Sequence, residues 1–266
     1  MPGITTGVAG YIVSRMGVDY GSRILFVFAF FSMASGVAVR WFLLKETSPD
    51  PKGREDLSTV SYREAFAALL HNARLRNVFL AQTALFLAGY LLFNFVPRFL
   101  VDGSGGLGLS EGASSIIPTA RAVVFTLFPV LVTMNVREKN AASLVLVGIA
   151  VLAAGTVLHA VIPAGSLLLA AAASVVYGAG MGVSRPAMEA LLGLAIPPRL
   201  RARLMSMVWT ACMGGTGAAS LAAGLVYDRL GPRMMMLAVA ALTLAALAPA
   251  VSLWRSGPRK RRKSPR

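Results

Sequence analysis

Long apolar stretches constrain this chain more than any other feature of its sequence. A helix needs about 20 apolar residues to cross a bilayer core of about 30 Å, because each residue adds about 1.5 Å of rise. Seven stretches reach that length, and they cover residues 24–44, 77–98, 112–134, 141–162, 166–192, 204–226 and 234–254. The sequence therefore predicts an all-α membrane protein whose chain crosses the bilayer repeatedly.

The composition supports this class and offers no sign of an enzyme. Hydrophobic residues make up 56% of the chain and charged residues only 14%, whereas a soluble domain carries about a quarter charged residues. The glycine run 178–182 lies inside an apolar stretch and follows no strand, so it is not a dinucleotide-binding loop. Cys212 is the single cysteine, and the two histidines, His71 and His159, lie far apart. We therefore expect no enzymatic activity, no cofactor and no metal site.

Lysine and arginine gather at alternate joins between the predicted spans. Membrane proteins orient themselves so that the loops richer in these residues face the cytoplasm. The richer joins contain Lys45, Lys52, Arg54, Arg63, Arg74, Arg76, Arg137, Lys139, Arg199, Arg201 and Arg203, and the chain ends in RSGPRKRRKSPR. We expect the linker and the C-terminal tail on the cytoplasmic side of the plasma membrane. Anionic lipid of the inner leaflet explains the basic tail, so the bilayer is the expected partner and nucleic acid is not.

Two stretches near opposite ends of the chain resemble each other. AGYIVSRMGVDYGSRILF covers residues 9–26, and AGLVYDRLGPRMMML covers residues 223–237. Six predicted spans separate the two copies, which indicates a six-helix unit repeated in the same orientation. Residues 2–14 are apolar but reach only about 20 Å, too short to cross alone. We expect them to be the second half of a spanning helix.

A parallel six-helix repeat is typical of the two halves of the major facilitator fold. Four segments, one of them within the second repeat copy, resemble transporters of that superfamily in order and spacing, over essentially the whole chain. They are the linker LLKETSPDPKGREDLSTVSYREAFAALLHNARLRN, the loop FVPRFLVDGSGGLGLSEGASSIIPTA, the helix and loop GAGMGVSRPAMEALLGLAIPPRLRARLMSM, and the turn AGLVYDRLGPR. If the resemblance holds, the chain starts within the fifth helix of a twelve-helix parent and is truncated at its N-terminus.

The resemblance implies a layout in four parts. Residues 1–44 would hold the end of an N-terminal bundle, with half of its fifth helix and all of its sixth. Residues 45–76 would form a cytoplasmic linker that is amphipathic around Tyr62–Leu70, and residues 77–254 a complete C-terminal six-helix bundle. Residues 255–266 would form a basic cytoplasmic tail.

Ionisable residues at membrane depth are costly, so each is a functional candidate. Arg121 lies near the middle of its predicted span. Arg185 and Glu189 stand four residues apart on one face of a helix, a spacing that permits an ion pair. For all three residues a purely structural salt bridge or carbonyl contact is the alternative to a role in binding a solute.

The resemblance adds softer candidates, because in the family the first and fourth helices of each half line the central path. On this basis Tyr90, Asn94 and Tyr177 join Arg121, Arg185 and Glu189 as expected residues of the substrate or ion path, and Gln82 is a further polar candidate. A separate group forms the outer-turn motif, where we expect a role in holding the turn: Asp228, Arg229, Gly231 and Arg233.

The function that the resemblance implies is secondary active transport of a small solute by alternating access, including efflux and proton-coupled variants. The substrate, the direction and the coupling ion are not specified by any motif in the chain. The rival interpretation is a transport-inactive, truncated membrane protein that acts as a remnant or a scaffold. Under the first interpretation, the missing N-terminal helices supplied as a separate chain are an expected partner.

Overall fold

The computed structural model describes residues 11–12, 15–43, 61–137 and 139–255, and these residues form helices and no strand. The helices are α2 (Val18–Leu43), α4 (Tyr62–His71), α5 (Ala73–Val101), α6 (Glu111–Thr133), α7 (Ala141–Val161), α8 (Leu167–Ala195), the short 3₁₀ helix η1 (Pro198–Leu200), α9 (Arg201–Leu230), α10 (Pro232–Ala245) and α11 (Leu247–Arg255). The all-α fold class expected from the sequence is confirmed. The half-helix expected over residues 2–14, the linker before residue 61 and the tail after Arg255 fall mostly or wholly outside the described residues.

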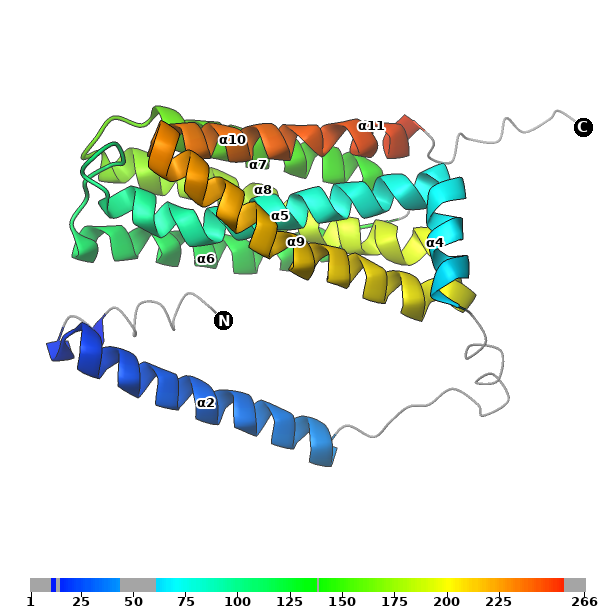
Figure 1. Cartoon of the computed structure of the whole chain (residues 1–266), viewed down its shortest axis with the longest axis horizontal. Coiled ribbons are helices and arrows are strands. Elements are labelled where there is room, and N and C mark those ends of the chain that lie inside the picture. The colour runs from blue at the N-terminus through cyan, green and yellow to red at the C-terminus, as the bar shows by residue number, and fades with distance from the viewer. Residues whose placement is uncertain (1–10, 13–14, 44–60, 138, 256–266) are drawn as a thin grey trace, which may run out of the picture.

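Helices α5 to α11 form one bundle along the long axis of the molecule, and α4 lies across one end of it (Figure 1). Consecutive helices alternate in direction, so α5, α7 and α9 begin at the α4 end and α6 and α8 finish there. Helix α8 is central because it packs against α5, α6 and α7. The bundle over residues 73–255 corresponds to the six-helix unit expected over 77–254.

Glycines bring the backbones of α7 and α8 into direct contact. A Cβ atom on Gly180 would lie 2.4 Å from the Leu152 backbone nitrogen, and one on Gly155 would lie 2.5 Å from the Tyr177 backbone nitrogen. A Cβ atom on Gly148 would clash with Ser184 in the same way. Small residues at membrane-helix interfaces allow this close approach, which gains dispersion energy where no hydrophobic effect drives association. The glycine-rich sequence of α8 therefore serves helix packing.

Local capping explains where several helices begin. The Ser61 hydroxyl accepts a hydrogen bond from the Glu64 amide at 3.1 Å, so Ser61 caps α4 in an S-x-x-E sequence that is typical of helix starts. Helix α4 then buries Ala65 and Leu69 against the bundle, as its amphipathic pattern predicts. The Arg203 guanidinium stacks 4.7 Å from the Tyr62 ring centre. The linker helix is therefore joined to the start of α9.

Six helical segments among the described residues are long and apolar enough to cross a membrane: Asp19–Val39, Ala73–Val101, Glu111–Thr133, Ala141–Val161, Leu167–Ala195 and Pro232–Arg255. The seventh expected span, 204–226, does form a helix, the 30-residue α9. Its apolarity falls below that of the others, because Gly214, Gly215 and Gly217 stand among its serines and threonines. Helix α9 is therefore the least apolar of the seven expected spans, although it is long enough to cross a membrane.

The last span is one apolar segment but two helices. Helix α10 ends at Ala245 and α11 begins at Leu247, with Ala246 between them. Pro249 lies in the first turn of α11, where it lacks an amide hydrogen and its ring crowds the carbonyl four residues earlier. This proline accounts for the break.

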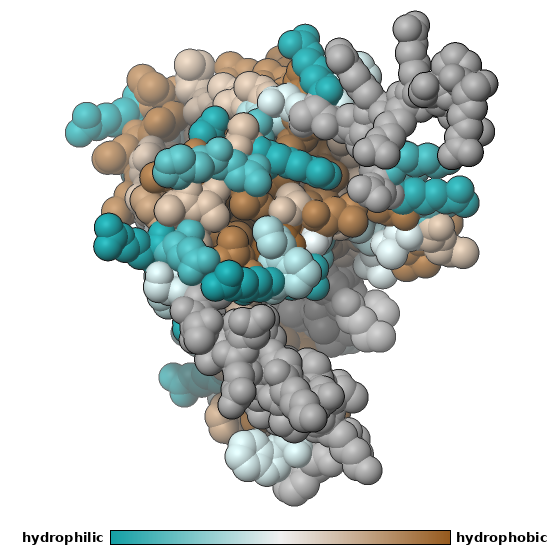
Figure 2. All heavy atoms as spheres, turned by 90° about the vertical axis from the view of Figure 1, so that its right-hand side faces the viewer, coloured by the Kyte–Doolittle hydropathy of each residue, from teal (hydrophilic) through white to brown (hydrophobic). Residues whose placement is uncertain are grey.

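Helix α2 stands apart from the bundle in Figure 1, and none of its apolar window is buried. Large side chains such as Phe26, Phe28 and Trp41 are exposed on it. Hydrophilic side chains instead gather at the end of the bundle that carries α4, as Figure 2 shows. That end holds the basic joins that the sequence analysis singled out, from Arg63 to Arg203.

The α7–α8 contact predicts a strong and local effect of a single methyl group. Gly180→Ala should destabilise the bundle by about 2 kcal/mol or more, because the new Cβ would overlap the α7 backbone. The expected result is a thermal unfolding midpoint in detergent lowered by about 5 °C or more. Gly193→Ala on the same helix is the control, since no atom lies within 4 Å of its Cβ position. Equal midpoints for the two variants would contradict the packing role of Gly180.

Candidate functional site

A cavity of about 500 Å³ lies between α5, α6 and α8. Each helix contributes residues at helical spacing, so one face of each borders the space. The lining residues are Gln82, Leu85, Phe86, Gly89, Tyr90, Phe93 and Pro97 from α5, Pro118, Arg121, Ala122 and Phe125 from α6, and Tyr177, Gly178, Met181, Ser184, Arg185 and Met188 from α8. The size falls within the range of small-molecule sites, and the lining is mostly apolar with a few polar groups, as such sites are.

Arg121 is the cavity-lining cation that has no ion pair among the described residues. It is the eleventh of the 23 residues of α6, near the middle of the span. Its guanidinium carbon lies 5.5 Å from the Phe93 ring centre and 5.7 Å from that of Tyr177. Both rings present π-electron density that attracts a cation. Within the described part of the chain, no carboxylate pairs with Arg121 and no acceptor takes its hydrogen bonds.

Glycine on α8 permits Arg121 to sit where it does. A Cβ atom on Gly178 would lie 3.1 Å from the Arg121 carbonyl oxygen and 3.3 Å from its Cγ. Gly182 faces Phe128 of α6 in the same way. The small residues of α8 thus bring the backbone of α6 close, and this places the guanidinium beside the Tyr177 ring.

Tyr177 is buried and joins α8 to α5. Its hydroxyl donates a long hydrogen bond of 3.4 Å to the Gly89 carbonyl oxygen. Gly89 also faces Met181, whose Cε atom would lie 2.8 Å from an added Cβ. Gly89, Tyr177 and Met181 therefore lie at one level of the cavity, and Arg121 shares that level through its contact with Tyr177.

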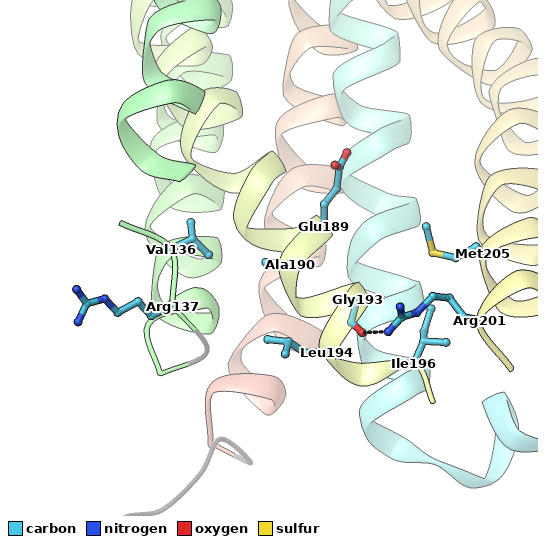
Figure 3. A pocket seen from close by; sticks show the side chains of 9 residues that line it. All are labelled: Val136, Arg137, Glu189, Ala190, Gly193, Leu194, Ile196, Arg201 and Met205. Carbon is cyan, nitrogen blue, oxygen red and sulfur yellow. Dashed lines mark hydrogen bonds between the residues drawn. The ribbon is translucent and has the colours of Figure 1, made fainter. Parts of the chain in front are cut away.

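Arg185 and Glu189 form the ion pair that their spacing predicts. The Arg185 Nε atom lies 3.7 Å from the Glu189 Oε1 atom, and both side chains are about half exposed. Arg185 lines the central cavity, whereas Glu189 lines a second cavity at the α4 end of the bundle. Figure 3 shows this second space, where Arg137 points away and Arg201 donates a hydrogen bond to the Gly193 carbonyl oxygen at 3.3 Å. The two residues of the pair, neighbours on α8, thus line two different cavities.

The three softer polar candidates on α5 differ in position. Tyr90 lines the cavity, whereas Asn94 does not, and the Asn94 side chain donates a hydrogen bond to the Tyr90 carbonyl oxygen at 2.8 Å. Gln82 lines the cavity nearer the α4 end and is only 7% exposed. The structure therefore brings Tyr90, Gln82, Arg121, Tyr177 and Arg185 together and leaves Asn94 and Glu189 outside.

The outer-turn motif holds loops together at the other end of the bundle. Gly231 adopts φ 93°, a conformation that favours glycine, and allows the tight turn from α9 into α10. Arg233 then donates hydrogen bonds to the carbonyl oxygens of Gly105 at 3.4 Å, Ala160 at 3.5 Å and Ile162 at 2.9 Å. Asp228 pairs with Arg98 at 3.6 Å. Arg229 makes no ion pair or hydrogen bond with the described residues.

Asp102 is a polar centre at this end that the sequence analysis did not single out. Its carboxylate accepts hydrogen bonds from the Ser104 hydroxyl at 2.6 Å, from the Ser104 amide at 2.7 Å and from the Tyr227 hydroxyl at 2.6 Å. These donors, the Ser104 hydroxyl first, lower the pKa of Asp102 from 3.8 to about 2. Because the pKa of Asp102 is lower in the folded chain, its ionised carboxylate stabilises the fold. This contribution is complete above pH 3.8 and is lost as the pH falls toward 2. The sequence does contain a signal for this centre, because an aspartate two residues before a serine can accept a hydrogen bond from the serine amide in a turn.

His159 is packed inside the bundle. Its Nδ1 atom lies 2.7 Å from the Gly155 carbonyl oxygen and its Nε2 atom 3.0 Å from the Ser174 hydroxyl. Both ring nitrogens therefore have partners, and the residue links α7 to α8. The described residues contain no group of three or more His, Cys, Asp or Glu side chains that could hold a metal ion.

Comparison with known proteins gives one match. Residues 105–266 match the family described as the Major Facilitator Superfamily, and this region covers more than half of the chain. No curated protein matches the chain, and no solved structure does.

The Arg233 contacts predict unequal effects for two arginines of the same turn. Arg233→Met should destabilise the bundle by about 2 kcal/mol, because three carbonyl oxygens lose a charged donor. Arg229→Met is the matched control, and we expect it to change stability by less than about 0.5 kcal/mol. Thermal unfolding in detergent measures both. Amide hydrogen exchange should rise around residues 105–107 and 160–165 in the first variant only, and a uniform response to both substitutions would speak against a clamp at Arg233.

Proposed function

Because the chain belongs to the major facilitator superfamily and is a multi-pass membrane transporter, we propose that it moves a small solute by alternating access through the cavity between α5, α6 and α8. The depth of the cavity along the helices carries this proposal, because the cavity is lined by one six-helix bundle alone. Solute sites in this fold lie near the bilayer midplane between the two halves. Arg121 borders the cavity at the middle of its span, which is where a solute would be held.

The unneutralised charge of Arg121 supports a role in binding. An arginine in the middle of a membrane span is costly unless it is paired or meets a polar space. Arg121 has two aromatic rings beside it but no carboxylate among the described residues. A packing arginine would be expected to have found an acceptor, so the free guanidinium favours a solute that supplies the anion.

The proposed orientation follows from the basic residues. The end of the bundle at α4 faces the cytoplasm, because the lysines and arginines of the described joins gather there. The end that carries Asp102 and Arg233 faces away from the cytoplasm. Under this orientation Glu189 and the second cavity lie on the cytoplasmic side of the central cavity.

Transport by the full chain in proteoliposomes tests the role of Arg121. When the N-terminal helices expected from the sequence are supplied as a second chain, we expect uptake of at least one radiolabelled organic carboxylate from a panel that includes benzoate and 4-phenylbutanoate, above that of empty liposomes. Arg121→Ala should lower the initial rate by about tenfold or more, because a charge-assisted contact is lost. Arg229→Ala should change it by less than about twofold, since the turn arginine contacts no described acceptor. Equal losses from the two variants would remove the special role of Arg121.

Single cysteines test the orientation. In a Cys212→Ala background, Gly103→Cys marks the proposed outer end and Lys139→Cys the proposed cytoplasmic end, and both positions are exposed. An impermeant maleimide added to intact cells should label only Gly103→Cys, because the bilayer shields the opposite side. After the cells are permeabilised, both variants should be labelled. Labelling of Lys139→Cys in intact cells would reverse the proposed orientation.

A further inference from the structure

The central cavity carries polar groups at two separate levels. Arg121 supplies a positive charge beside Tyr177, at the level of Gly89. Gln82 supplies a carboxamide on the same face of α5 as Gly89, closer to the α4 end. Seven residues separate Gln82 from Gly89, and at about 1.5 Å of rise per residue the two levels lie about 10 Å apart.

Gln82 is a buried polar side chain without a partner. It is 7% exposed, and it lines the cavity. Among the described residues nothing donates a hydrogen bond to its carboxamide or accepts one from it. Because this carboxamide faces the cavity unpaired, a ligand group that hydrogen-bonds to it from within the cavity would be favoured. A carboxamide both donates and accepts, which suits a neutral partner such as an amide or a hydroxyl.

The wall between these two levels is apolar and aromatic. Phe86 of α5 faces the space between the two levels, with Met181 of α8 opposite, and Phe93 lies beside Arg121. Methionine and aromatic side chains form adaptable surfaces for apolar and aromatic ligands. A ligand that reaches from one polar level to the other would therefore need an apolar body in between.

The charges that line the cavity favour a ligand with one anionic group. Two cationic side chains line the space, Arg121 and Arg185. Arg185 already pairs with Glu189 at 3.7 Å, so its charge is compensated. Arg121 has no such partner within the described ranges. One uncompensated cation favours a monoanion.

From these observations we infer that the cavity binds an amphipathic organic monoanion, with its carboxylate at Arg121 and a neutral hydrogen-bonding group at Gln82 about 10 Å away, joined by an apolar, aromatic body. The inference rests on the proposed function, because it takes the cavity to be the solute site. It adds a chemical class of solute and gives Gln82 a role as a binding residue that recognises the end of the ligand opposite the anion.

The protein contains its own reporter for this cavity. Phe86 lines the space, and its ring packs edge-on against Trp209 of α9 with the ring centres 5.7 Å apart. The chain has three tryptophans, so Trp41→Phe and Trp254→Phe leave Trp209 as the single tryptophan, which can be excited apart from the tyrosines. A ligand that contacts Phe86 should change the Trp209 emission, and this change gives Kd for the full chain in detergent.

Three probes separate the two polar contacts. The first, 4-(4-carbamoylphenyl)butanoate, has a carboxylate, an aromatic body and a distal amide. The second, 4-(4-isopropylphenyl)butanoate, has the same shape without the amide. The third is the methyl ester of the first and lacks the negative charge. We expect the first probe to bind about fivefold tighter than the second and about 30-fold tighter than the third, as one neutral and one charged hydrogen bond would give.

Two substitutions should act on different ends of the ligand. Gln82→Leu should remove the advantage of the amide, weakening the first probe by about fivefold while it leaves the second within about twofold. Arg121→Gln should weaken both carboxylates by about 30-fold and leave the ester nearly unchanged. Asn94→Leu is the matched control, because it also replaces a carboxamide on α5 but lies outside the cavity, and we expect the wild-type order of affinities.

The results separate this inference from the proposal of transport. If Gln82→Leu weakens the first two probes equally, or if the amide gives no advantage in the wild type, the inference is overturned even when carboxylate flux depends on Arg121. The same holds if none of the probes changes the Trp209 emission. If the affinities follow the expected pattern but no probe enters proteoliposomes, the ligand class stands and transport fails.

Discussion

The backbone contact between α7 and α8 determines the arrangement of the rest of the bundle. Gly148, Gly155 and Gly180 leave no room for a Cβ atom between these helices, so α8 can rotate little about its own axis. Its orientation then decides which residues meet α6 and which meet the cavity. Gly178 receives the Arg121 backbone, while Tyr177, Met181 and Arg185 face the space beside α5. A contact between glycines of each helix and the backbone of the other thus positions a charged site on a third helix.

The charged site at Arg121 is costly to place in the membrane, and it borders the central cavity. Most charges in the bundle lie at its two ends, where Arg98 meets Asp228 at the end opposite α4 and Arg199 meets Glu64 at the α4 end. Arg121 lies in the middle and meets only aromatic faces. Cation–π contacts compensate a guanidinium less completely than a carboxylate does. Arg121 can therefore still form charged hydrogen bonds with an anion, and this is the physical basis for a role in binding.

The two ends of the bundle are built differently. At the end opposite α4, Arg233, Asp102 and Tyr227 tie the loops after α5, α7 and α9 into one network of hydrogen bonds. At the α4 end, the contacts are looser ion pairs and stacking, such as Glu64 with Arg199 at 3.9 Å and Arg203 over Tyr62. Exposed ion pairs contribute little to stability. The α4 end therefore has fewer strong contacts to break if the helices move there.

The sequence by itself determined the helices, most of their ends and the superfamily, because hydrophobic length, capping residues and loop motifs are local properties of the chain. It also marked Arg121, Arg185 and Glu189, since a charge in an apolar run is visible without a structure. Only the tertiary structure decided that Gln82 faces the cavity while Asn94 turns to its own helix, and that Arg233 rather than Arg229 holds the loops. Such choices depend on which helix lies opposite each face. That neighbour is set by packing between segments far apart in the chain.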